Sequence, residues 1–95
     1  MAQSTILAAA KTAATSTDVT VTAGTPVTIG VFSATYGRVP HDALFTVYAD
    51  TPGADNVWAV LTDEKRAVTI EAPGTYRVKR TVYSTGESFG VYLET

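Results

Sequence analysis

Short runs of alternating hydrophobic and polar residues recur along most of this chain. A period of two is typical of β-strands, whose successive side chains point to opposite faces of a sheet. Turn signals rich in Gly, Pro, Asp and Ser separate the runs. The runs cover residues 19–22, 27–32, 43–49, 57–61, 68–71, 75–82 and 88–93. This pattern predicts an all-β fold, a single small immunoglobulin-like β-sandwich of about seven antiparallel strands.

The best-defined stretch is residues 68–80, VTIEAPGTYRVKR. Pro73 fixes its own φ and Gly74 tolerates positive φ, so the Ala-Pro-Gly sequence predicts a tight corner between two strands. A Tyr placed just after the corner, here Tyr76, resembles the tyrosine corner of immunoglobulin-like sandwiches. In that motif the phenol hydroxyl bonds back to the backbone of the turn.

The alternation after the corner sorts side chains between the core and solvent. Tyr76, Val78 and Val82 share the face that we expect to be buried. Arg77 and Lys79 share the opposite face, where they either remain solvated or pair with an acidic partner surface. Five of the seven basic residues lie between residues 65 and 80.

Other positions give further expectations about the core. Arg80 falls on the inward face near a strand end, so its stem should close the core while its head reaches water. Trp58 and Val60 share one face of their run and are expected to be buried. Gly30 should leave a bare patch of backbone on the outer face, suited to a bulge or another chain.

The first 17 residues are rich in Ala, Thr and Ser. They form either a first edge strand or an N-terminal arm that orders against a partner, and residues 18–95 form the sandwich domain. We expect no cleaved signal peptide, because the apolar run of residues 6–10 is short, ends at Lys11 and lacks a preceding positive region. No run approaches the ~20 apolar residues of a membrane span, so no membrane partner is expected.

Composition narrows the classes of function. The chain has 95 residues, enough for one domain. Its net charge of −2 provides no basic field for nucleic acid. It contains no cysteine, which excludes disulfides, Cys-based zinc sites and thiol catalysis, and favours folding in the cytosol.

Three sequence features suggest catalysis or metal binding, and none has the context that the chemistry requires. Residues 86–90, GESFG, match the GxSxG nucleophile elbow. That motif requires a following helix and a later His, whereas a strand follows Ser88 and His41 lies upstream, so a turn is the better reading. His41 alone cannot hold zinc.

The loop that contains Asp50, Asp55 and Asn56 lacks the ligand spacing of an EF-hand, although calcium binding is the alternative to a turn. We therefore expect no catalytic residue, metal or cofactor, and no enzymatic activity.

Several apolar and aromatic side chains remain as candidates for a partner interface. Tyr is enriched in interface cores, and the Tyr residues of the set are predicted off the main core face. The alternative is that they simply stabilise the outer sheet faces. The candidate interface residues are Ile6, Leu7, Tyr36, Tyr48, Tyr83 and Tyr92.

Three segments resemble small structural proteins of tailed bacteriophages. They are residues 18–29, DVTVTAGTPVTI, residues 72–78, APGTYRV, and residues 88–91, SFGV. The resemblance implies a virion accessory protein without catalytic residues. It implies most specifically a decoration or cement protein, often trimeric, that binds the major capsid protein from outside and reinforces the shell. Such a protein is made in the cytoplasm of the host bacterium.

Two alternatives stay open. The chain could belong to the phage tail, collar or baseplate. In a different class, it could bind carbohydrate or a cell surface, with Trp58 and the Tyr side chains as stacking platforms.

Overall fold

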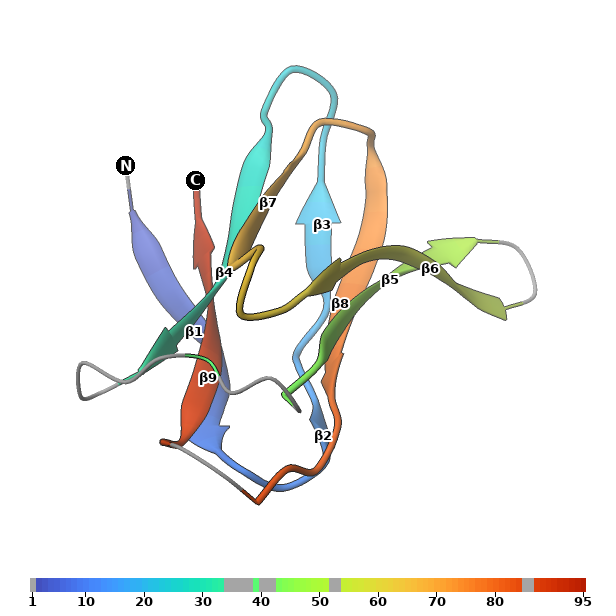
Figure 1. Cartoon of the computed structure of the whole chain (residues 1–95). Coiled ribbons are helices and arrows are strands. Elements are labelled where there is room, and N and C mark those ends of the chain that lie inside the picture. The colour runs from blue at the N-terminus through green and yellow to red at the C-terminus, as the bar shows by residue number, and fades with distance from the viewer. Residues whose placement is uncertain (1, 34–38, 40–42, 52–53, 85–86) are drawn as a thin grey trace.

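Two antiparallel β-sheets make up the computed structural model, which describes residues 2–33, 39, 43–51, 54–84 and 87–95 (Figure 1). These described residues contain no helix, so the predicted all-β sandwich is confirmed. They contain nine strands: β1 (Gln3–Ala10), β2 (Ala14–Thr15), β3 (Val19–Val21), β4 (Val27–Ser33), β5 (Phe45–Thr51), β6 (Ala54–Leu61), β7 (Ala67–Ile70), β8 (Gly74–Arg80) and β9 (Phe89–Glu94). The count exceeds the predicted seven because residues 3–15 contribute β1 and β2.

The strand order of each sheet determines which segments lie side by side. The first sheet runs β1-β9-β4-β7, and the second runs β2-β8-β5-β6 with β3 also paired to β8. In immunoglobulin domains the last strand shares a sheet with the strand before it. Here β9 lies in the sheet opposite β8, between β1 and β4. The protein therefore shares the two packed sheets of immunoglobulin domains, but its last strand lies in the other sheet.

Residues 2–33 contribute strands to both sheets in turn. β1 is an edge strand that pairs only with β9 among the described strands. β2 and β3 then pair in succession with β8 in the second sheet. The turn after β3, closed by a bridge between Thr22 and Thr25, returns the chain to β4 in the first sheet. The runs 19–22 and 27–32 therefore do not form a hairpin with each other.

The inward faces of both sheets meet in one hydrophobic core. Alternate residues of β4, β5, β8 and β9 point into it, as period-two patterning requires. The largest fully buried side chains are Phe45, Phe89, Ile29, Leu61, Ile70, Val47, Val78 and Val91.

The corner between β7 and β8 has the predicted geometry. Gly74 has φ +153°, a region that residues with a side chain rarely adopt. The hydroxyl of buried Tyr76 donates a hydrogen bond to the carbonyl of Ala72 at 2.8 Å. The Tyr76 side chain therefore connects the start of β8 to the corner that precedes it.

Three predictions of burial are wrong. Val82 is 69% exposed, because β8 ends at Arg80 and the alternation does not continue beyond it. Trp58 is 47% exposed and Val60 is 40% exposed. Trp58 is exposed because of a bulge in β6: Ala59 pairs with Val47 and Val57 pairs with Tyr48, which leaves Trp58 with no partner residue in β5. Val60 lies beyond the bulge and directly opposite Thr46, so it points to the outer face while its neighbour Leu61 is buried.

Candidate functional site

Strand β6 forms one edge of the second sheet and exposes apolar side chains. Among the described strands it pairs only with β5. Val57, Trp58 and Val60 are 62%, 47% and 40% exposed, and we call these three residues with their strand the β6 edge. Asp55 is the only charged residue in the strand. Edge strands are usually protected by charges or Pro, so a long apolar edge is suited to pairing with another chain.

The ring of Trp58 joins this edge to the core. It packs edge-to-face on Tyr76, with 5.4 Å between ring centroids and 71° between ring planes. Tyr76 is buried, whereas Trp58 keeps nearly half of its surface exposed. At the bulge, one part of the Trp58 ring therefore covers the buried Tyr76, and the rest of the ring faces solvent.

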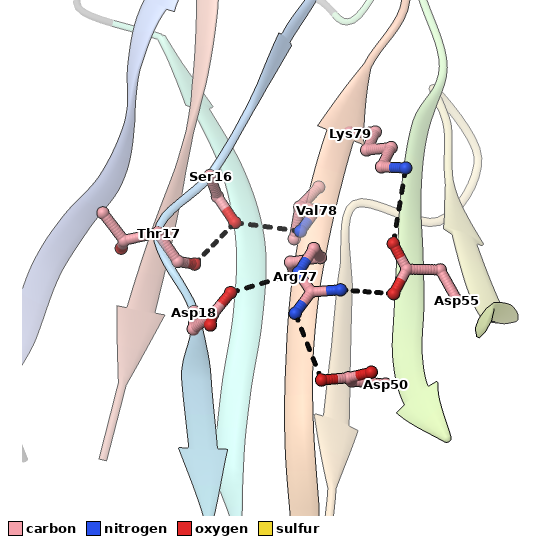
Figure 2. Close-up of polar contacts among 8 residues, drawn as sticks. All are labelled: Ser16, Thr17, Asp18, Asp50, Asp55, Arg77, Val78 and Lys79. Atoms are coloured by element: carbon pink, nitrogen blue, oxygen red, sulfur yellow. Dashed lines mark hydrogen bonds and ion pairs between the residues drawn. The ribbon is translucent and has the colours of Figure 1, made fainter. Parts of the chain in front are cut away.

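A cluster of charged side chains lies on the outer face of the second sheet, around Arg77 of β8 (Figure 2). Arg77 Nε donates to Asp18 Oδ1 at 3.1 Å, and its Nη2 lies 3.4 Å from Asp50 Oδ2. Its Nη1 donates to Asp55 Oδ1. The hydrogen bond to Asp18 raises the pKa of Arg77, against a smaller opposing effect of burial. One guanidinium therefore links β5, β6, β8 and the segment before β3.

Lys79 extends this cluster. Its Nζ lies 3.4 Å from the second carboxylate oxygen of Asp55 and 4.7 Å from the ring centroid of Tyr48. Tyr48, one of the candidate interface residues, is half-buried on this face. The cationic face expected from the sequence is thus paired within the chain. We call Asp18, Asp50, Asp55, Arg77 and Lys79 the Arg77 cluster.

The Arg77 cluster also includes the two carboxylates that the calcium alternative for residues 50–56 depends on. Asp50 and Asp55 direct their carboxylates at Arg77 and Lys79 (Figure 2). The described part of the chain contains no group of three or more His, Cys, Asp or Glu residues placed to hold a metal ion. His41 lies outside the described residues.

Ser16 positions the acidic side of the cluster. Its hydroxyl accepts a hydrogen bond from the backbone N–H of Val78 at 2.9 Å and donates to the carbonyl of Thr17 at 2.9 Å. β2 and β3 both pair with β8, and Ser16 lies in the gap between them. Its hydroxyl keeps this gap in contact with β8. The chain bends at this point, and the bend brings Asp18 beside Arg77 (Figure 2).

Two of the candidate interface residues are buried in the single chain. Leu7 is 8% exposed and lies opposite Val91 in the core. Tyr83 is 5% exposed, and its hydroxyl accepts a hydrogen bond from the N–H of Phe89 at 2.9 Å. The prediction that Tyr83 lies off the core is wrong, because the chain turns inward after β8 and period-two alternation no longer applies. Ile6 is half-buried, and Tyr36 lies outside the described residues.

Tyr92 lies on the outer face of the first sheet, directly opposite Gly30 in the β4–β9 register. A β-carbon at position 30 would collide with the end of the Tyr92 ring. The bare backbone patch predicted at Gly30 is therefore covered by the chain's own Tyr92. This face is the opposite side of the molecule from the Arg77 cluster, since the two sheets pack through their inner faces.

Arg80 is buried, and the prediction that its head reaches water is wrong. Its Nε donates to the carbonyl of Thr12 at 2.7 Å, and its Nη1 donates to those of Ala8 and Phe89 at 2.8 and 2.9 Å. Burial lowers the pKa of Arg80. β1 and the segment after it cover the end of β8, and a local sequence pattern contains no information about that long-range contact.

The remaining motif lacks a catalytic context. Ser88 is exposed, it is followed directly by strand β9, and Gly86 of the GxSxG match lies outside the described residues. No helix of the described chain is long and apolar enough to cross a membrane. Comparison of the chain with protein-family models, curated proteins and solved structures found no match.

Proposed function

We propose that the chain is a non-enzymatic structural protein that attaches to a larger protein assembly through the β6 edge. The specific assembly that we propose is the outside of a tailed-phage capsid, where the chain would act as a decoration protein. The observation that carries the proposal is the β6 edge itself. It combines three exposed apolar side chains and a single charge on a strand that, among the described strands, pairs only with β5.

The backbone of the β6 edge favours attachment by addition of a partner strand. An extended segment of a partner can add to an exposed sheet edge, where main-chain hydrogen bonds give affinity and side-chain pockets give specificity. β6 is eight residues long, which is longer than the typical strand of about five to six residues. Val57 is the most exposed side chain of the strand among its large hydrophobic residues, so its burial would give the largest gain.

The charged side chains next to the β6 edge also favour docking. Removing charges from water is unfavourable unless they are paired. Next to the β6 edge, the Arg77 cluster pairs its cations and carboxylates within the chain. A partner that covers this region would meet fixed, mutually compensated charges, which lowers the desolvation cost of docking.

The phage capsid as partner comes from the resemblance of residues 18–29, 72–78 and 88–91 to phage structural proteins. A small module also benefits from binding to a lattice, because a bound partner stabilises the folded state by mass action. The same resemblance is compatible with a place in the tail, and the location of a tagged copy on virions by electron microscopy separates these two positions.

Sedimentation of the purified chain with capsids assembled without it tests the proposal. We expect the wild-type chain to pellet with the capsids. Val57→Asp should remain in the supernatant, because it places a charge on the docking edge. The matched control is Val82→Asp, which puts the same charge on a residue of similar exposure outside β6.

Circular dichroism of both variants verifies their folding. A wild-type chain that stays entirely in the supernatant would contradict capsid binding. A folded Val57→Asp variant that pellets as the wild type does would leave capsid binding intact and contradict the role of the β6 edge.

A further inference from the structure

The outer face of the first sheet carries two aromatic rings, each placed over a glycine of the neighbouring strand. Gly30 pairs with Tyr92, and Phe32 pairs with Gly90, in the register of β4 and β9. A β-carbon at position 90 would lie 2.8 Å from Phe32 Cε1, and one at position 30 would collide with Cε1, Cζ and Oη of Tyr92. Both glycines therefore leave room that the opposite ring occupies.

The Tyr92 ring lies over residue 30 and not beside it, because three atoms at the end of the ring come equally close to the same point. A ring that rests on backbone in this way presents its other face outward. Phe32 and Tyr92 are diagonal neighbours on the same face, about 7–8 Å apart at their Cα atoms in such a register. Together they form a shallow aromatic floor.

Polar side chains of β1 border this floor. A hollow of about 430 Å³ is lined by Gln3, Ser4, Thr5, Phe32 and Tyr92. Its volume falls within the range of about 300–1,000 Å³ for small-molecule sites. Gln3 is held in place by a hydrogen bond from its Nε2 to Glu94 Oε1 at 2.7 Å. The hollow thus combines apolar ring faces with amide and hydroxyl groups, and the Glu94 carboxylate lies next to it.

We propose that this hollow binds a neutral sugar ring of an oligosaccharide. A pyranose has an apolar C–H face, which suits the rings of Phe32 and Tyr92, and a rim of hydroxyls, which suits the side chains of Gln3 and Thr5 on the same face. Among the residues that the structure describes, no Lys or Arg lines the hollow, and the carboxylate of Glu94 lies beside it. This charge disfavours nucleic acid and acidic sugars, because phosphate recognition depends on cationic side chains. The ligand class follows from the residues that line the hollow.

The sugar site is independent of the β6 edge, since the two lie on different sheets. A chain attached to a capsid through β6 would keep the outer face of the first sheet turned away from that contact. The two proposals can therefore fail separately.

Titration of the ¹⁵N-labelled full chain with neutral gluco-, galacto-, manno- and N-acetylglucosamine oligosaccharides, followed by NMR, tests the inference. We expect at least one series to shift the amide resonances of residues 3–5, 30–32 and 90–92. Tyr92→Leu should weaken that binding at least tenfold, whereas Tyr92→Phe, which keeps the ring, should retain most of it. Gln3→Ala provides a second variant on the exposed edge strand, and should also weaken binding.

Trp58→Leu is the matched aromatic control, because Trp58 is exposed on the second sheet. It should leave the affinity unchanged. The inference is overturned if no oligosaccharide shifts these resonances, or if the shifts map to β6 and disappear in Trp58→Leu. It is also overturned if a folded Tyr92→Leu binds as tightly as the wild type, or if a proline-rich peptide or an acidic glycan binds this face in preference to every neutral sugar.

Discussion

The phenol ring of Tyr92 in β9 fills the space above Gly30 in β4 that a side chain would otherwise occupy. The ring can rest on the backbone of β4 only because residue 30 has no β-carbon. A second glycine, Gly90, allows a closer approach. A β-carbon there would collide with the carbonyl oxygen of Leu7 and lie 2.8 Å from the backbone nitrogen of Ala9.

The two glycines should therefore differ in their tolerance of Ala. Gly30→Ala can be accommodated when the end of the Tyr92 side chain moves aside, so we expect a loss near the lower end of the ~1–3 kcal/mol typical of overpacking. Gly90→Ala requires β1 to separate from β9, so we expect a loss at or above the upper end of that range. Urea denaturation measures both, and equal losses would contradict the close approach of β1 to Gly90.

Arg80 should be essential for the attachment of β1. Arg80→Met removes the donors of three backbone hydrogen bonds, to Thr12, Ala8 and Phe89. At about 1 kcal/mol for each bond, the free energy of unfolding should fall by about 3 kcal/mol. Amide exchange in β1 should accelerate more than in β5. Arg66→Met is the control, because exposed Arg66 donates a single hydrogen bond, to Val31, and its loss should be well below that of Arg80.

The Arg77 cluster should make stability depend on salt. Ion pairs near the surface weaken as the Debye length shortens from about 10 Å at 0.1 M to about 3 Å at 1 M ionic strength. Arg77→Met should destabilise the fold at low salt, and the difference from wild type should shrink at 1 M NaCl. Thermal melts in a salt series measure this. Lys65→Met removes the same charge outside the cluster, and a salt response equal to that of Arg77→Met would contradict a specific role for Arg77.

The two structural tyrosines should differ in their response to loss of the hydroxyl. Tyr83→Phe leaves the buried N–H of Phe89 without its acceptor, which should cost about 1–3 kcal/mol. Tyr76→Phe removes only a donor to the carbonyl of Ala72, and should cost about 1 kcal/mol or less. Chemical denaturation of both variants compares them directly, and a greater loss for Tyr76→Phe would contradict this ranking.

The sequence predicted the parts of the fold in which local patterning and burial agree. Period-two alternation located the core of β4, β5, β8 and β9, and Pro73 and Gly74 marked the corner that Tyr76 closes. Prediction failed for Trp58 because this residue is the extra residue of a bulge in β6 and has no partner in β5. It left β1 undecided because small Ala side chains give a weak pattern and the pairing partner lies at the other end of the chain.

The side-chain clusters were harder to predict than the strands. Arg77 was expected on the outer face, which is where it lies, but its acidic partners come from positions 18, 50 and 55. Only the order of β3, β8, β5 and β6 brings those positions together. The pairing of Gly30 with Tyr92 and of Gly90 with Phe32 likewise depends on the register of β4 against β9. An outward Gly opposite an outward aromatic would have been a signal, but it requires that register.

The pairing of β1 with β9 has a consequence for the order of assembly. The backbone N–H and C=O groups of Ala2 and Thr95 are joined by two hydrogen bonds, of 3.1 and 3.0 Å, and both chain ends lie side by side (Figure 1). β1 is therefore synthesised long before β9, the strand with which it pairs, and contacts so distant in sequence slow folding. Until β9 is synthesised, β1 lacks the strand with which it pairs, and Arg80 lacks the carbonyl of Phe89, one of its three acceptors. During that interval the nascent chain presents two open sheet edges, and this is when it is most exposed to aggregation.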